Sequence, residues 1–223
     1  MKNLKNALLL KQLYQRKQLG YAYTSITSFK EVAPELTLPS TLSSLKKQAQ
    51  ECHLCELSKS RKNVIFGEGN SHADIMFIGD APNNSDDSIA KIFTGRAGEL
   101  LSKMITNVLG LSREEVYISN LLKCHTLDSH NPSASHTHTC YPYILKEIAL
   151  VQPKIIVTLG TLAYEYLSHE DSPLEEVHGI VHQKEKYILI PTFHPNYLLK
   201  NPSKKKAVFE DLKKVKKLYD SLL

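Results

Sequence analysis

The sequence predicts an α/β protein with a three-layer α/β/α arrangement around a central, mainly parallel four-stranded sheet. Four apolar runs of strand length alternate with longer amphipathic stretches. The runs are DIMFIG (74–79), VYISN (116–120), KIIVTLG (154–160) and YILIPT (187–192). Such alternation is typical of parallel strands joined by helices that cover both faces of the sheet. The 223 residues, 42% of them hydrophobic, suffice for one domain of this type with a small appendage.

Residues 1–40 are expected to form a helical extension and connector that precede this domain. Leu4, Leu8 and Leu13 lie near one face of a helix over residues 1–20, with lysines at other positions. Pro34 and Pro39 indicate an irregular connector after it. We therefore expect the main domain to comprise residues 41–223.

The last helix is expected over residues 203–222. Its apolar residues recur at helical spacing, opposite a lysine-rich face: Val208, Leu212, Val215, Leu218 and Leu222. A solvated surface explains such a lysine run more often than a phosphate-binding one.

Composition excludes several classes of protein. No apolar stretch approaches the roughly 20 residues of a membrane-spanning helix, and Leu8 to Leu10 are too few for the core of a signal peptide. We therefore expect a cytoplasmic monomer that does not contact membranes. Lys and Arg total 28 against 23 Asp and Glu, a net charge of +5 that permits a polyanionic partner without requiring one.

Polar side chains follow three of the predicted strands at their carboxyl ends. Asp80 follows the first strand, Asn120 closes the second, and His194 lies two residues beyond the fourth. In open parallel sheets, ligands bind outside the carboxyl ends of the strands. Each residue alone has an ordinary explanation, as a helix cap, a turn former or a buried histidine. Their convergence on one edge of the sheet favours a functional site.

Four cysteines indicate a metal centre. A C-x-x-C pair is followed, far along the chain, by two cysteines with fifteen residues between them: Cys52, Cys55, Cys124 and Cys140. Structural zinc sites usually have two short-spaced pairs, whereas a 4Fe-4S cluster accepts thiolates from distant loops, so the cluster is favoured. Zinc remains an alternative because imidazoles lie in the same segment, at His125, His136 and His138. Four unrelated buried cysteines are the third interpretation.

From about Cys52 onward, the chain resembles the iron-sulfur (family 4) uracil-DNA glycosylases. The matching segments cover about three quarters of the chain and include ECHLCELSKSRKNVIFGEGN, FIGDAPNNSDDSIAKIFTGRAGELL, VYISNLLKCHTLDSHNP and PTFHPNYLLKNP. The resemblance implies an enzyme that flips uracil out of DNA and hydrolyses its N-glycosidic bond, with the four cysteines as ligands of a 4Fe-4S cluster. Uracil-containing DNA is the implied partner.

The resemblance also implies roles for individual residues. Phe93 matches the aromatic on which the extruded uracil stacks, and Asn120 matches the amide that recognises the imide edge of the base. His194 matches the histidine that faces the uracil oxygen on which negative charge develops. Asp80 stands beside the sugar, where it either orients the attacking water or stabilises the sugar cation.

Further contacts are implied with less detail. Gly79 and Asp86 are expected to contact the substrate, with Asp86 or its neighbour Asp87 excluding the methyl group of thymine. DNA contacts are expected from a second group: Arg96, Asn196, Leu198 and Leu199. The two leucines are candidates for an apolar wedge into the base stack.

The sequence departs from the family pattern at several positions. Asp80 stands where glutamate is usual, Asn83 replaces a glycine, and Ile92 replaces the proline that commonly precedes the stacking Phe. His125 and Thr126 replace a common Arg-Pro pair. Two other functions therefore stay open: a non-catalytic iron-sulfur or zinc protein that binds nucleic acid, and a related glycosylase whose histidine cross-links to DNA.

Overall fold

The computed structural model describes residues 38–126 and 132–222. The predicted helical extension falls almost entirely outside these residues, and its boundary at residue 40 stays a prediction. No helix in the described ranges combines the length and apolar character that crossing a membrane requires.

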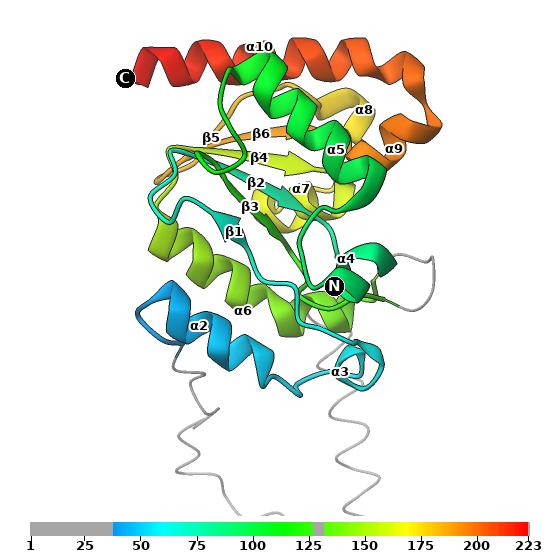
Figure 1. The fold of residues 1–223 in the computed structure, drawn as a ribbon. Coiled ribbons are helices and arrows are strands. Elements are labelled where there is room, and N and C mark those ends of the chain that lie inside the picture. The colour runs from blue at the N-terminus through cyan, green and yellow to red at the C-terminus, as the bar shows by residue number, and fades with distance from the viewer. Residues whose placement is uncertain (1–37, 127–131, 223) are drawn as a thin grey trace, which may run out of the picture. The chain divides into compact units, whose positions relative to one another are not determined.

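The sheet has six strands in the order β1-β3-β2-β4-β6-β5 (Figure 1). Its four central strands are parallel and confirm the four apolar runs to within a residue at each end: β2 (Ile75–Gly79), β3 (Tyr117–Asn120), β4 (Ile155–Leu159) and β6 (Ile188–Thr192). Two strands of two residues each were not predicted and pair antiparallel at the edges: β1 (Glu68–Gly69) and β5 (His182–Gln183).

Helices cover both faces of this sheet, as the fold prediction requires (Figure 1). On one face lie α5 (Gly95–Met104), the π-helical turn η1 (Ile105–Leu109) and α10 (Lys205–Leu222). On the other face lie α2 (Leu42–Gln50), α6 (Ala134–Val151) and α7 (Thr161–Ser168), which contacts α6 through Tyr141 and Tyr166. Shorter elements complete the described chain: α3 (Leu57–Ser60), α4 (Asn84–Ile89), α8 (Leu174–Val177), α9 (Pro195–Lys200) and the 3-10 turn η2 (Pro202–Lys204).

The last helix shows how the apolar pattern sets the packing. Val208, Leu212 and Val215 are buried, as their spacing predicts, and belong to the main hydrophobic core. Leu222 is exposed at the end of the helix. All five residues of β2 and of β4 are buried, which explains their uninterrupted apolar runs between two helical layers.

Candidate active site

The carboxyl ends of β2, β3 and β6 meet at one edge of the sheet, which we call the carboxyl rim. Because these strands are parallel, Asp80, Asn120 and His194 all follow or close their strands at this rim, as predicted. Figure 1 shows α4, the start of α5 and α9 gathered at the same end of the sheet.

Asn120 closes β3 with its side-chain amide buried and unpartnered. The residue is only 1% exposed, and neither its Oδ1 nor its Nδ2 has a hydrogen-bond partner. Leaving such a group unpaired costs about 1–3 kcal/mol, so native proteins rarely tolerate it without a reason. A ligand that presents one donor and one acceptor would satisfy this amide.

Phe93 lies next to Asn120 and packs on His194. A Cβ placed on Gly79 would stand 2.5 Å from Asn120 Oδ1 and 2.6 Å from Phe93 Cζ, so the three residues are close neighbours. Gly79 therefore makes room for both side chains. The Phe93 and His194 rings stack with centroids 5.5 Å apart and 27° between their planes. Phe93 thus links the amide of β3 to the imidazole that follows β6.

The loop that carries Phe93 holds a strained backbone. Phe93 has φ +48°, in the left-handed region that disfavours residues with a Cβ. A Cβ on Gly98 would stand 1.6 Å from the Phe93 carbonyl oxygen, so only glycine allows α5 to approach this loop. Arg113 donates from Nη2 to the Ile92 carbonyl oxygen at 2.5 Å. The conformation of Phe93 is therefore imposed by its surroundings.

Asp86 stabilises the same loop from the other side. Asn83 and Asp86 form a capping box at the start of α4, and Asp86 Oδ1 also accepts from the backbone N–H of Thr94 at 2.7 Å. The carboxylate of Asp87 accepts from the backbone N–H groups of Lys62 and Asn63. These contacts position the turn before Phe93, and they explain why asparagine suits position 83.

His194 begins α9 as its N-cap. Its Nδ1 accepts from the backbone N–H of Asn196 at 3.1 Å, which leaves Nε2 to carry the proton of the neutral ring. Burial lowers the pKa of His194 to about 4. At neutral pH, the side chain is therefore an uncharged imidazole with a single N–H donor at Nε2.

Asp80 lies just past β2, against the start of α7. Its Oδ1 accepts from the backbone N–H of Ala163 at 2.8 Å, so the carboxylate acts as a cap for a helix from another part of the chain. Gly160 has φ +105°, and a Cβ there would stand 2.6 Å from Asp80 Oδ2. The helix therefore begins on a glycine that admits the carboxylate.

The carboxyl of Asp80 is electrostatically unusual. Burial raises its pKa to about 7, against the lowering effect of the Ala163 hydrogen bond, and the nearby Glu165 raises it further. The effect of burial on the pKa is larger than that of the hydrogen bond at the helix terminus, because burial removes water from most of the carboxylate. Asp80 therefore exchanges its proton near neutral pH, which is a property typical of functional carboxyls.

Asp80 and His194 line one small cavity. The cavity measures about 220 Å³, with Gly160, Phe193 and Tyr197 among its other walls. Phe93 lines a separate, more open hollow of about 660 Å³ on the α5 side, and Asn120 lines neither space. The structure thus places the acid and the imidazole together and brings Phe93 between that imidazole and the buried amide.

The candidate DNA-contacting residues differ in exposure. Arg96 on α5 and Asn196 on α9 are exposed. Leu199 is 40% exposed, whereas its neighbour Leu198 is 0% exposed and part of the main core. Of the two leucines, only Leu199 is therefore available as a surface wedge in this structure.

The four cysteines come from four places in the fold and are all free thiols: Cys52 after α2, Cys55 before α3, Cys124 after β3 and Cys140 within α6. Cys55 and Cys140 pack against the cluster formed by Leu57, Leu122 and Cys124. In the described ranges, no group of three or more His, Cys, Asp or Glu side chains is arranged to hold a metal ion.

The thiols nevertheless lie within electrostatic reach of one another. Burial raises the pKa of Cys140 to about 12, and the sulfurs of Cys124 and Cys52 add to this rise. Burial also raises the pKa of Cys124, with contributions from Cys55 and Cys52, while Arg61 donates to the Cys124 sulfur at 3.2 Å. Four thiols that affect one another's pKa, with a cationic donor beside one of them, are a chemically suitable ligand set for a thiolate-bound cluster.

Several residues of the site had no assigned role in the sequence-based interpretation. The sequence gives no sign of the roles of Arg113 and Gly98, because only the fold brings them against the Phe93 loop. Arg61 lies within a segment that carries the family resemblance, but its contact with Cys124 spans 63 positions. Lys123 does stand out in the sequence, because it is a charged residue that follows an apolar stretch and directly precedes Cys124.

Comparison with known proteins agrees with this geometry. A family model described as the uracil DNA glycosylase superfamily matches residues 66–214. The chain is 40% identical over 182 residues to a type-4 uracil-DNA glycosylase of Saccharolobus solfataricus, covering 78% of this chain and 84% of the relative.

Two further relatives carry the same name. The Sulfurisphaera tokodaii protein is 37% identical over 186 residues, covering 80% of this chain and 84% of its own length. The Thermotoga maritima protein is 34% identical over 176 residues, with 77% and 91% coverage. The resemblance found in the sequence is confirmed over most of its length. The chain belongs to the uracil-DNA glycosylase superfamily.

Proposed function

We propose that this protein is a DNA repair glycosylase that flips uracil out of DNA and hydrolyses its N-glycosidic bond, leaving an abasic site. The observation that carries the proposal is the buried amide of Asn120, which has no partner for either of its polar atoms. It lies beside Phe93 at the rim that also holds Asp80 and His194. The names of the relatives support the same activity.

Asn120 would recognise the base. Its Nδ2 donates to a uracil carbonyl oxygen, and its Oδ1 accepts from the ring N–H between the two carbonyls. Cytosine presents a lone pair in place of that N–H, so it leaves Oδ1 unpaired and is rejected. Phe93 supplies a stacking surface that recovers part of the cost of extruding the nucleotide. Because Phe93 packs beside Asn120, its ring must turn to admit the base.

Asp80 and His194 would stabilise the opposite charges that develop as the bond breaks. The electron pair of the bond leaves with uracil, and the sugar becomes an oxocarbenium-like cation. The neutral imidazole donates from Nε2 to the uracil oxygen that gains charge, a contribution of about 3 kcal/mol for one such preorganised donor. The Asp80 carboxylate faces the sugar.

Water completes the reaction. Its oxygen bonds to the anomeric carbon, one of its protons ends on the departing uracil, and the hydroxyl stays on the abasic sugar. Asp80 accepts a hydrogen bond from this water and so orients it. Aspartate is one methylene shorter than the glutamate usual at this position, and its contact with the start of α7 fixes where that shorter carboxylate lies.

The four cysteines would hold the cofactor: Cys52, Cys55, Cys124 and Cys140. A bound 4Fe-4S cluster would fasten the segments around α2, β3 and α6 to one another, and hydrolysis itself requires no electron transfer. Arg61, which donates to Cys124, favours the thiolate form that such binding needs.

Incubation with a uracil-containing oligonucleotide, followed by alkali, tests the proposal. We expect strand cleavage at uracil, and a loss of kcat/KM on the order of 10²-fold in Asn120→Ala with affinity for undamaged DNA unchanged. Intact strands together with retained DNA binding would instead indicate a non-catalytic binding protein. Protein–DNA adducts that survive denaturing electrophoresis would indicate the covalent alternative.

A further inference from the structure

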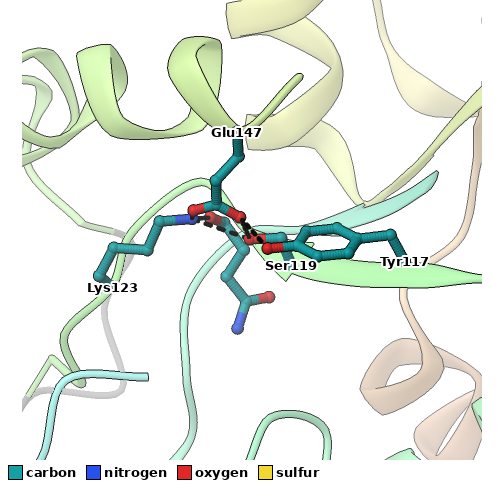
Figure 2. A network of polar contacts seen from close by, with 5 residues as sticks. Tyr117, Ser119, Lys123 and Glu147 are labelled. Carbon is teal, nitrogen blue, oxygen red and sulfur yellow. Dashed lines mark hydrogen bonds and ion pairs between the residues drawn. The ribbon is translucent and has the colours of Figure 1, made fainter. Parts of the chain in front are cut away.

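A buried polar network lies directly behind Asn120 and has no part in the chemistry described above. It consists of Tyr117, Ser119, Lys123 and Glu147, and we call it the Lys123 network (Figure 2). Figure 2 shows the side chains from β3 and the following loop pointing toward the Glu147 carboxylate, which comes from α6. Lys123 and Glu147 are 2% and 0% exposed, so water does not compete for these contacts.

The ammonium group of Lys123 makes three polar contacts, an ion pair and two hydrogen bonds. Its Nζ forms an ion pair with Glu147 Oε1 at 2.5 Å and donates to Ser119 Oγ at 2.8 Å. The third contact is with the backbone carbonyl oxygen of Asn120, at 2.7 Å. Ser119 in turn donates to Glu147 Oε2 at 2.7 Å, which closes the network. The ammonium group therefore has one fixed position, and that position holds the main chain of Asn120.

This contact matters because, among the residues that the structure describes, no hydrogen bond orients the Asn120 amide. Both polar atoms of that side chain lack partners, so the direction of the amide follows from its backbone and from packing. A peptide plane that tilts at Asn120 would move Oδ1 and Nδ2 away from the positions that a base edge requires. Hydrogen-bond recognition tolerates errors of only a few tenths of an ångström and about 20°.

The same lysine also reaches the cysteine centre. Its backbone N–H lowers the pKa of the Cys140 thiol, against the larger opposing effect of burial, and so lies near that sulfur. The next residue is Cys124. Cys140 and Glu147 lie seven positions apart on α6, about two turns, and so face the same side of the helix. The side chain of Lys123 therefore ties the loop after β3 to α6, and the backbone of the same residue lies near the cysteine of that helix.

We propose that Lys123, held by Glu147, is a positioning residue that sets the amide of Asn120 for uracil recognition and joins that amide to the cysteine-bearing helix. The inference rests on the proposed function. Stability alone does not call for charges here, since well-packed apolar residues commonly replace a buried ion pair without loss.

The double variant Lys123→Met/Glu147→Leu tests the proposal, because it removes the network and leaves no unpaired buried charge. The inhibition constant of free uracil and KM for a uracil-containing oligonucleotide should both rise on the order of tenfold. Affinity for undamaged DNA should stay within about twofold of wild type, since no DNA-facing residue changes. The matched control is Val151→Ala, which removes buried volume from the same helix and should lower Tm without changing uracil inhibition.

A double-mutant cycle with Asn120→Ala separates positioning from a general loss of structure. If Lys123 acts through Asn120, removing the network in the Asn120→Ala background changes uracil inhibition no further. Equal, additive losses in both backgrounds would overturn the proposal. Should the double variant not fold, Ser119→Ala removes one support of the ammonium with little change in volume, and an unchanged uracil inhibition constant in that variant would also overturn it.

Measurements on the wild-type protein distinguish a failure of the proposed function from a failure of the role proposed for Lys123. Wild type that neither cleaves the oligonucleotide nor is inhibited by uracil overturns the proposed function, and this inference with it. Wild type that does both, alongside a network variant that is inhibited equally well, overturns the role of Lys123 alone.

Discussion

At the scale of single residues, burial acts on the two charge-bearing groups of the site in opposite directions. It raises the pKa of Asp80 to about 7 and lowers that of His194 to about 4, and in both cases the uncharged form gains. The imidazole is therefore a neutral donor at every pH above about 5, whereas the carboxyl changes charge near neutrality. The acid, and not the histidine, should set the pH dependence of the enzyme.

The first prediction concerns that pH dependence. In the proposed mechanism only the carboxylate form of Asp80 would stabilise the sugar cation, so kcat/KM should rise with pH through about 7. Asp80→Asn should lower kcat by at least about 10²-fold and abolish this rise. A pH profile of single-turnover rates measures both effects. A profile that keeps the same inflection in the asparagine variant would assign the titration to another group.

The same substitution should stabilise the fold. The native carboxyl has a higher pKa than the unfolded one, so folding disfavours its charged form. The cost in stability begins as the pH rises past the unfolded pKa of 3.8 and is complete above about pH 7. Asparagine carries no such cost and keeps an oxygen for the Ala163 N–H. We expect Asp80→Asn to gain about 1–3 kcal/mol at pH 8. The gain should vanish as the pH falls from 7 toward 4, and denaturant titrations at both ends of that range measure it.

Some residues of the site could be predicted from the sequence and others could not. Asp80, Asn120 and His194 were predictable as a group because each stands at the end of an apolar run, where parallel strands expose their carboxyl ends. Lys123 and Arg113 were not, because their partners lie 24 and 21 positions away and no periodicity connects them. Contacts of this kind depend on how distant segments pack together, which local patterns do not encode.

At the scale of elements, the segment between α4 and α5 controls the position of Phe93. The left-handed backbone of Phe93 is unfavourable by itself, and its neighbours compensate through the Ile92 carbonyl, the Thr94 amide and the close approach of α5. Ile92, which stands where the family commonly has proline, is buried, and its carbonyl accepts the Arg113 bond. The guanidinium therefore supplies a restraint on this turn.

Arg113→Met tests this restraint. Without the bond to Ile92, the Phe93 loop should sample other conformations, and kcat/KM should fall about 10-fold with only a small change in Tm. The fluorescence of a 2-aminopurine placed beside uracil would show slower base flipping. Lys103→Met, which removes an exposed cation from the same hollow, is the matched control and should behave as wild type.

The strands that bury the most apolar surface were the ones that the sequence predicted. The four central strands were predictable because two helical layers demand continuous apolar runs. The edge strands β1 and β5 were missed, since two residues are too few for any alternation to appear.

At the scale of the whole described chain, the four cysteines lie on segments that pack together only through small apolar clusters. The segment around α2 and α3 contributes only small apolar clusters, which contain Leu45 and Phe66 or Leu57 and Leu122, and two of the thiols belong to it. A group bound by all four cysteines would join this segment to β3 and α6. Its removal should therefore loosen one side of the domain and leave the main core intact.

The iron and sulfide content of the purified protein tests whether the four cysteines bind a cluster. Purified protein should be brown and contain about four iron and four sulfide per chain. Removal of the iron by oxidation and chelation should lower Tm, and proteolysis should then begin near α2 and α3. Cys55→Ser should show the same cleavage pattern without chelation. A colourless protein with stoichiometric zinc would contradict the cluster and support the alternative ligand chemistry.

The two brief strands at the borders of the sheet affect how the protein behaves at high concentration. Aggregation through strand addition needs a long row of free backbone donors and acceptors, and each border offers only two residues of regular strand. A second molecule would gain little by docking there. Concentrated stocks should therefore resist fibril formation even after prolonged storage.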